Sequence, residues 1–383
     1  MFEKILVANR GEVALSCMRT CKELGIATVA VYSELDAQAS FVAYADESVC
    51  IGPADPELSY RNANNILSAA LITGCQAIYP GYGYFASDPS FISACAEHGI
   101  TFIGPDYDSA AFLGEPELLL QLAKQCGVPT SYGLETQPLR MVEVPVLVDS
   151  LGNRVILCER DCTISLNGES LVEEAPAAYL SDATRRSMGV SSQKLLRALD
   201  FCGLAFLRFA ITQDGSFYLD AVSFELSRGY GVVEVVSGVD LIAEQIRISA
   251  GESLSCTSLV PFSRSCHVVG FCVRVKDSAE RFAQNPGTMK YSSFPGGLGI
   301  RLDTQGGLSQ LAYGPYGDHA AHLMAWGNTR ESAIARGKRA LSEIAVEGVE
   351  TTISIQQGIM GNAAYNEGDI FTDFMESEMG VLQ

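Results

Sequence analysis

The stretch "KILVANRGEVALSCMRTCKELG" (Lys4–Gly25) opens the chain with two contrasting patterns. Its first five residues are almost continuously apolar, which is typical of a strand buried on both faces of a parallel sheet. The apolar residues that follow recur at helical spacing, and Gly25 is a suitable C-cap for that helix. We therefore expect a buried strand that leads directly into a helix, the first half of a βαβ unit.

The same alternation continues through the first hundred residues. Four short apolar segments follow, "ATVAVYS", "ESVCIGP", "CQAIYP" and "ITFIGP", and the helical segment "NANNILSAALITG" separates two of them. Short strands that alternate with helices predict a doubly wound parallel sheet, a Rossmann-like domain. No G-x-G-x-x-G follows the first strand, so the dinucleotide fingerprint is missing.

Beyond Leu139 the pattern becomes mainly antiparallel. The segments "RMVEVPVLVD", "NRVILCERD", "AFLRFAIT" and "SFYLDAVSFEL" read as strands, and Asp214-Gly215 is a hairpin signal between the last two. A helix interrupts them, and after "GVDLIAEQIRISAGE" the chain returns to strands and a final helix, "TRESAIARGKRALSEIAVEG". A chain of 383 residues is too long for one small core, so we expect two or three packed units.

Charge and composition exclude several classes of partner. The net charge of −19 argues against nucleic acids and anionic membranes as partners. No apolar run is long enough to span a bilayer, and the first residues enter a strand at once. We therefore expect no signal peptide, no membrane insertion and a cytoplasmic location.

The cysteines and histidines give no sequence motif for a metal. Twelve cysteines are present, but the close pairs, such as Cys17 and Cys21, are four apart rather than three. We expect buried, reduced thiols that act as small apolar side chains. His319 and His322 could ligate a metal, but only Asp318 stands beside them in the sequence, so we expect no metal site.

Several motifs resemble biotin carboxylase, the ATP-grasp component of acetyl-CoA carboxylase and its relatives. They are "KILVANRGEVAL", "RTCKELGI", "AIYPGYG", "GITFIGP", "ERDC", "VEEAPA", "SGVDLIAEQIRISAGE", "FPGGLGIR" and "RESAIARGKRAL", in the family's order. The resemblance implies a Rossmann-like N-terminal domain (residues 1–113), an ATP-grasp centre (114–264) and a C-terminal domain (265–383). In the family, ATP and magnesium activate bicarbonate, which carboxylates biotin on a carrier protein.

The sequence departs from the family pattern where the chemistry is expected. Only "TSYGLETQPL" stands where the family has a mobile lid over the nucleotide. Proline and uncharged side chains replace a phosphate-facing lysine, the metal carboxylates and the base, and a glutamate replaces an arginine. The degenerate positions are Pro116, Phe209 (or Arg208, if the hairpin register slips by one), Ala221, Ser223, Glu225 and Gly229. Asp220 and Glu225 cannot compensate together without a β-bulge, because they point to opposite faces of a regular strand.

These departures predict a catalytically inactive pseudoenzyme without ATP, magnesium or biotin sites. Such a protein would be a structural or regulatory subunit that associates with itself, with an active biotin carboxylase or with the biotin carrier protein. Two alternatives stay open. One is a divergent active carboxylase or ligase with relocated residues, and the other is a sensor of biotin or an anion that uses the family-like remnant Tyr82, Gly83 and Arg301.

Residues that match the family's dimer contacts are kept. They are Arg19 and Glu23 on the first helix, and Trp326 and Arg330 before the last long helix. Tryptophan and arginine contribute strongly to protein interfaces, so we expect a retained association surface. Alternatively, Trp326 is an ordinary core residue and the charged residues form a solvated face.

Overall fold

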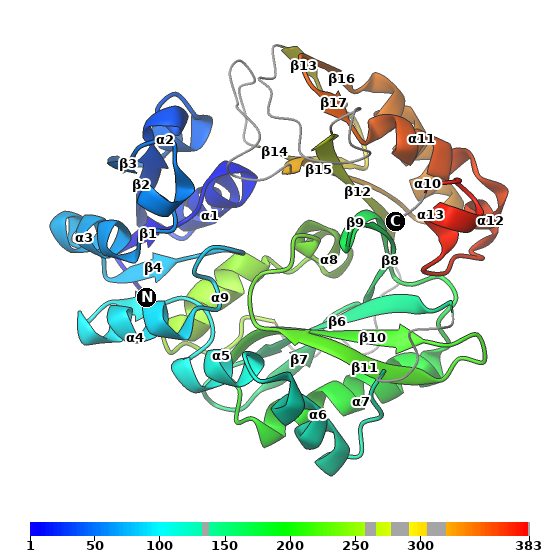
Figure 1. The fold of residues 1–383 in the computed structure, drawn as a ribbon, viewed down its shortest axis with the longest axis horizontal. Helices are drawn as coiled ribbons and strands as arrows, with labels where there is room; N and C mark the ends of the chain where they lie inside the picture. Colours follow the sequence, from blue (N-terminus) through cyan, green and yellow to red (C-terminus); the bar gives the residue numbers. More distant parts are fainter. Residues whose placement is uncertain (132–137, 257–265, 277–290, 305–318, 382–383) are drawn as a thin grey trace.

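A computed structural model describes residues 1–131, 138–256, 266–276, 291–304 and 319–381 (Figure 1). Two sheets carry most of the architecture, with a short strand pair beside them. The N-terminal sheet lies at one side of the molecule, and the helices of the last fifty residues lie at the opposite side.

The N-terminal sheet has five parallel strands in the order β3-β2-β1-β4-β5, as the alternating pattern predicts. Its strands are β1 (Lys4–Val7), β2 (Ala27–Ser33), β3 (Glu47–Gly52), β4 (Ala77–Tyr79) and β5 (Thr101–Phe102). Its helices are α1 (Gly11–Glu23), α2 (Ser40–Tyr44), α3 (Ala63–Thr73), α4 (Pro89–Glu97) and α5 (Tyr107–Leu113), with 3-10 turns at Glu34–Asp36 and Pro56–Leu58.

Strand β1 is buried on both faces, which explains its continuous apolar sequence. Ile5 and Val7 join a core with α1 and α9 (Leu241–Ser249), whereas Leu6 joins the core on the other face, with α3 and α4. The first of these cores also includes Phe206 from the second sheet. The N-terminal domain therefore shares a hydrophobic core with the centre of the molecule.

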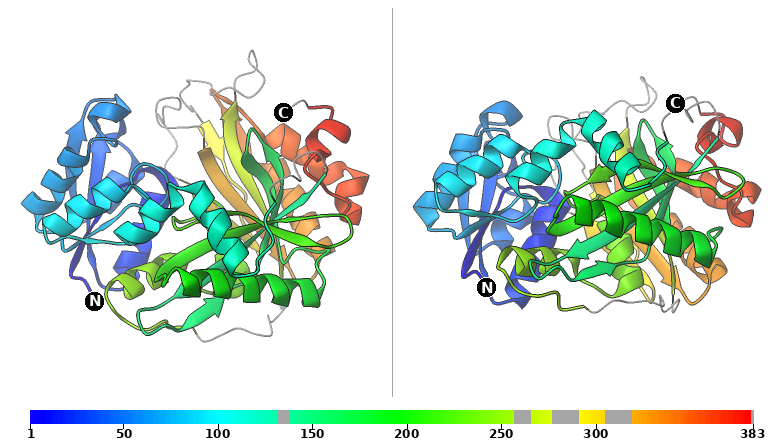
Figure 2. Two further views of the ribbon diagram at one scale, coloured as in Figure 1. Left: turned by 60° about the horizontal axis from the view of Figure 1, so that its bottom comes forward. Right: turned by 90° about the horizontal axis from the view of Figure 1, so that it is seen from below.

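The second sheet has ten strands, which come from both the central and the C-terminal parts of the chain. Its main path is β11-β10-β6-β8-β9-β12-β15-β14, and β7 and β17 pair with β6 and β12. The central elements are α6 (Pro116–Gln125), β6 (Arg140–Val148), β7 (Arg154–Ile156), β8 (Arg160–Leu166), β9 (Glu169–Ala175), α7 (Asp182–Ala198), β10 (Gly203–Ile211), β11 (Phe217–Ser223) and α8 (Tyr230–Ser237). Helix α7 runs along the face of the sheet formed by β6 and β10 (Figure 2).

The C-terminal part continues the same sheet. Its strands are β12 (His267–Lys276), β13 (Tyr291–Ser293), β14 (Ile300–Thr304), β15 (His319–Gly327), β16 (Ala345–Glu347) and β17 (Glu350–Thr351), and β13 and β16 form the separate pair. Its helices are α10 (Arg330–Glu343), α11 (Ile353–Gly361), α12 (Ala363–Glu367) and α13 (Phe374–Ser377). Strand β12 pairs with β9, so the sheet crosses the domain boundary predicted at residue 264.

The hairpin of β10 and β11 contains a β-bulge, so its register shifts by one residue between Arg208 and Phe209. Arg208 pairs with Ala221 and Phe209 pairs with Leu219, so Asp220 is an extra residue between them. Phe209 is fully buried against the core beside α7, and Arg208 faces the other side. The bulge therefore decides which of the two side chains can reach a ligand.

Among the described residues, no helix is both long and apolar enough to cross a membrane. All twelve cysteines are free, but only seven are buried: Cys50 is exposed and four others are partly buried, so the expectation of buried thiols holds in part. The cytoplasmic location stays a prediction.

Candidate functional site

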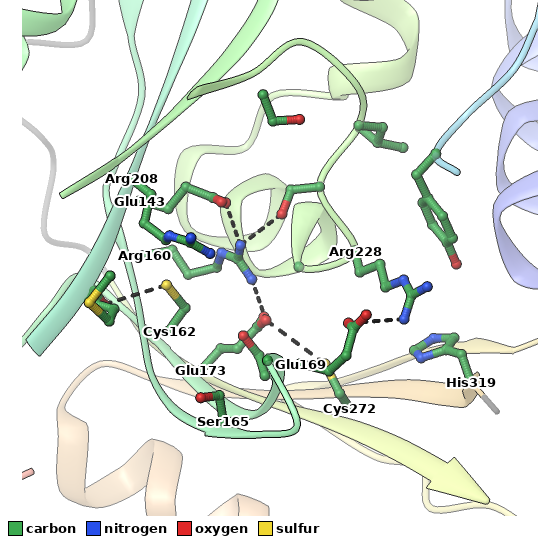
Figure 3. Close-up of a pocket in the computed structure, with 18 of the residues that line it drawn as sticks. Glu143, Arg160, Cys162, Ser165, Glu169, Glu173, Arg208, Arg228, Cys272 and His319 are labelled. Carbon is green, nitrogen blue, oxygen red and sulfur yellow. Dashed lines mark hydrogen bonds and ion pairs between the residues drawn. The ribbon is translucent and has the colours of Figure 1, made fainter. Parts of the chain in front are cut away.

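A cavity of about 540 Å³ lies over the second sheet, where β6, β8, β9 and β12 present polar side chains (Figure 3). The loop after β11 and the turn at Tyr82 and Gly83 form its other side. Glu225 in this loop accepts a hydrogen bond from the backbone N–H of Gly83 at 2.7 Å. The cavity is thus bounded by the N-terminal domain and by both halves of the large sheet.

Arg160 is the central cation of the cavity floor and is 3% exposed. Its guanidinium donates to Glu143, to Glu173 and, at 2.8 Å, to the hydroxyl of Ser227 (Figure 3). Burial disfavours the charge, but the attraction of Glu143 and Glu173 outweighs it and raises the pKa of Arg160. Although burial alone would raise the pKa of Glu173, the Arg160 charge lowers it to about 2.

Gly229 gives Arg160 the space that it occupies. A Cβ at this position would lie 1.6 Å from Nη1 of Arg160 and 2.4 Å from Oε2 of Glu173. The sequence predicts the loss of a base at Gly229, and the structure shows that the Arg160 guanidinium occupies the space a side chain there would take. A side chain at position 229 would require Arg160 to move.

The rim of the cavity carries two exposed arginines. Nε of Arg208 lies 2.7 Å from Asp220, and Nη1 of Arg228 lies 2.9 Å from Glu169. Both arginine side chains are more than 40% exposed, so a ligand can compete for their guanidinium groups. Arg228 also lies over the ring of Tyr82, which is one of the predicted remnant residues.

The degenerate positions are divided between the cavity and the rest of the fold. Ser223, Glu225 and Gly229 line the cavity, Phe209 lies in the core, and Ala221 stands opposite Arg208 in the hairpin. Pro116 is the first residue of α6. Residues 126–139 connect α6 to β6, and the predicted shortened lid segment falls partly outside the described residues.

The predicted remnant is not one cluster. Tyr82 and Gly83 line the cavity, whereas Arg301 lies in a second hollow beside α1, where it pairs with Glu234 at 2.7 Å and Asp303 at 2.8 Å. The guanidinium of Arg301 is therefore engaged within the chain by two carboxylates.

The residues predicted to form the dimer contact differ in solvent exposure and in their contacts within the chain. Arg19 and Glu23 are exposed on α1, while Trp326 is partly buried. Arg330 is used within the chain, where it donates twice to Glu174 at 2.8 Å.

Sequence reasoning missed Glu143, Glu173 and Cys272 as cavity residues. A signal was present for the two acidic residues, because each follows apolar residues within a strand: Glu143 follows Val142, and Glu173 follows Val172. Cys272 gave no such signal, because cysteine counts as an apolar residue in these patterns. Buried acidic residues are rare unless they have a partner, so an acidic residue in such a run indicates a buried polar cluster.

Comparisons with known proteins cover the whole chain. Three family models match, which are the biotin carboxylase N-terminal domain (residues 1–110), the ATP binding domain of the carbamoyl-phosphate synthase L chain (135–257) and the biotin carboxylase C-terminal domain (272–377). Biotin carboxylase of Nostoc sp. and biotin carboxylase 1 of Bacillus subtilis are each 33% identical, over 98% of this chain and 99% of theirs.

Solved structures agree with this result. The biotin carboxylase domain dimer of Hydrogenobacter thermophilus 2-oxoglutarate carboxylase, in complex with MgADP, ADP and bicarbonate, has a TM-score of 0.93 at 30% identity over 100% of this chain and 98% of that one. The Campylobacter jejuni biotin carboxylase complex with β,γ-ATP has a TM-score of 0.91 at 27% identity, over 98% of each chain.

These comparisons correct the prediction of an inactive pseudoenzyme without ATP, magnesium and biotin sites, which is wrong. The similar proteins are named as carboxylases, one similar structure holds MgADP and bicarbonate, and an ATP binding domain model matches the centre of the chain. The prediction failed because it counted side chains lost from the β10–β11 hairpin. It omitted the carboxylates that β6 and β9 bring into the same cavity, and Arg160 on β8.

Proposed function

The chain belongs to the biotin carboxylase family, and from this premise we propose that it is an ATP-dependent carboxylase that uses bicarbonate and biotin. The observation that carries the proposal is the cavity of the ATP-grasp sheet, which combines carboxylates with solvent-exposed arginines at its rim. The family match over the full chain supports it.

The residues of the cavity fit a magnesium nucleotide in their chemistry. Magnesium prefers oxygen ligands, and Glu143, Glu169 and Glu225 would supply them. Guanidinium groups bind phosphate and bicarbonate through paired N–H donors, and Arg208 and Arg228 would hold these anions. Bound ATP supplies a phosphoryl group that activates bicarbonate.

The chain itself would contribute binding, orientation and shielding. The buried floor of Arg160, Glu143 and Glu173 is held rigid by charge-assisted hydrogen bonds, so it presents a fixed polar surface to a ligand. The rim arginines would select anions and orient them against this floor. The turn at Gly83, bonded to Glu225, would limit the access of water from the N-terminal side.

The test is steady-state release of ADP by the purified full-length chain with ATP, magnesium, bicarbonate and free biotin. We expect hydrolysis that depends on both bicarbonate and biotin, and a loss of at least tenfold in kcat/KM in the double variant Arg208→Met, Arg228→Met. The control is Arg61→Ala, which removes an exposed ion pair with Glu57 far from the cavity and should leave the rate unchanged. Absence of bicarbonate-dependent hydrolysis, together with no rise in melting temperature on addition of MgATP, would refute the proposal.

We further propose that the chain associates with a second copy of itself, or with a biotin carboxylase or biotin carrier protein, through the exposed face of α1. The Hydrogenobacter domain in the comparison is a dimer, and Arg19 and Glu23 are exposed as a contact requires. Sedimentation velocity of the chain alone tests self-association. The charge-reversal variant Arg19→Glu should shift the distribution toward monomer, and a wild-type chain that is monomeric at all concentrations would contradict self-association.

A further inference from the structure

Three buried side chains from separate segments meet below the cavity. Glu173 lies on β9, Cys272 on β12 and His322 on β15, and these strands are neighbours in the large sheet. Cys272 and His322 are directly paired across β12 and β15, and Glu173 faces Gly270 across β9 and β12. They are 1%, 4% and 1% exposed, in the order Glu173, Cys272 and His322.

Three polar atoms of this cluster lack a hydrogen-bond partner. Neither ring nitrogen of His322 has one, and neither does Oε2 of Glu173. Nε2 of His322 lies 3.5 Å from that oxygen, and Sγ of Cys272 lies 3.8 Å from the other carboxylate oxygen. Because buried polar atoms almost always have a partner, their convergence without one points to a missing occupant.

The spacing of the three groups suits a tetrahedral metal ion. One ligand atom from each of Glu173, Cys272 and His322 lies within 4.8 Å of the others. Zinc bonds of 2.0–2.3 Å at tetrahedral angles separate neighbouring ligand atoms by roughly 3.3–3.8 Å. A thiolate and an imidazole favour zinc and similar transition metals, whereas magnesium prefers oxygen ligands alone.

The cluster is closely packed on one side and adjoins the cavity on the other. Gly270 lies against it, since a Cβ there would approach Cγ2 of Val232 to 2.5 Å and Nε2 of His322 to 2.9 Å. Glu173 and Cys272 also line the cavity, so a fourth coordination position can face it.

We propose that Glu173, Cys272 and His322 form a three-ligand site for a divalent transition metal of the zinc type, with its fourth position open toward the cavity. This site is separate from the magnesium that accompanies ATP, and its existence does not depend on the carboxylase activity proposed above. It differs from the interpretation of His319 and His322 as a pair of ligands, because His319 lies outside the cluster.

The test uses the full-length chain, stripped with a chelator and titrated with Co²⁺ as a spectroscopic substitute for zinc, without nucleotide. We expect one equivalent of Co²⁺ to bind with a thiolate charge-transfer absorption and tetrahedral d–d bands. Cys272→Ser should abolish the charge-transfer absorption, and His322→Gln should weaken Co²⁺ binding at least tenfold.

Matched controls separate this site from adventitious binding. Cys162→Ser changes another buried thiol of the same cavity, and His267→Gln changes a buried histidine that pairs with Glu174. Both controls should keep the spectrum of the wild-type chain. No bound Co²⁺ in the wild type, or a charge-transfer absorption that survives in folded Cys272→Ser, would overturn the proposal. Circular dichroism establishes that each variant is folded.

Discussion

Glu173 and Glu174 are consecutive buried residues of β9, and each has an arginine and a histidine nearby. The surroundings of Glu174 are complete, because Arg330 binds both of its oxygens and His267 lies at 2.9 Å. Those of Glu173 are less complete, since its Oε2 has no hydrogen-bond partner and only a longer contact, 3.5 Å, with Nε2 of His322. The difference teaches that burial of charge alone does not distinguish a ligand site from a structural contact. Incomplete pairing distinguishes them.

The largest expected effect comes from removing the arginine of each cluster. Arg160→Met would remove the ion-pair partner of the partly buried Glu143 and leave the buried Glu173 with only longer contacts, such as that of 3.5 Å to His322, and we expect a loss of about 3–5 kcal/mol in the free energy of unfolding. Arg330→Met should cost less, about 1.5–3 kcal/mol, because His267 still contacts Glu174. Urea denaturation followed by circular dichroism measures both. Equal losses would contradict the distinction between the two clusters.

The carboxylate of Glu234 should make the free energy of unfolding depend on pH near neutrality, unlike those of Glu173 and Glu174. Burial raises the pKa of Glu234 to about 7, despite its ion pair with Arg301. Because the folded-state pKa exceeds the unfolded value of 4.5, this group contributes stability below pH 4.5 that is lost as pH rises through 7, in total about 3 kcal/mol.

Glu234→Gln lacks that titration. Its stability relative to the wild type should therefore rise between pH 5 and pH 8, as measured by urea denaturation at each pH. A stability difference that stays constant over this range would show that Glu234 is already ionised in the folded protein at pH 5.

Substitution of Glu173, but not of Glu174, should abolish the stabilisation of the folded chain by zinc. If zinc binds the folded chain only, a free concentration one hundred times the dissociation constant stabilises it by about 2.7 kcal/mol. We expect this gain in the wild type and in Glu174→Gln, and its absence in Glu173→Gln, as read from denaturation with and without zinc. A gain in Glu173→Gln would assign the zinc effect to another part of the chain.

The smallest expected effect on stability concerns the rim. Arg228→Ala removes an ion pair with Glu169 in which both side chains are 41% exposed, so we expect a change below about 1 kcal/mol. A small change in melting temperature, together with weaker bicarbonate dependence of ADP release, would show that the rim contributes to binding and the floor to stability. A large loss of stability would contradict the assignment of binding to the rim and of stability to the floor.

The fold could be predicted from local pattern, but the clusters could not. Continuous apolar residues in Lys4–Ala8 and helical spacing after Gly11 reflect burial by near neighbours, so the parallel sheet follows from the sequence. His322 was judged beside Asp318, its neighbour in sequence, whereas its partners Glu173 and Cys272 reach it only through sheet pairing. Arg208 and Phe209 could not be separated, because a one-residue bulge decides which of them faces the cavity.

The pairing of β9 with β12 has a consequence for how the chain can be divided. One family model ends at residue 257 and the next begins at residue 272, so β9 and the second half of β12 fall in different models, which suggests separable modules. Cutting there would remove the neighbour of β9 and expose its N–H and C=O groups as a free sheet edge, a surface that promotes aggregation. It would also leave Glu173 without Cys272 and His322. Evolution can therefore exchange these two modules, or experiment can express them, only if the new arrangement supplies a replacement strand.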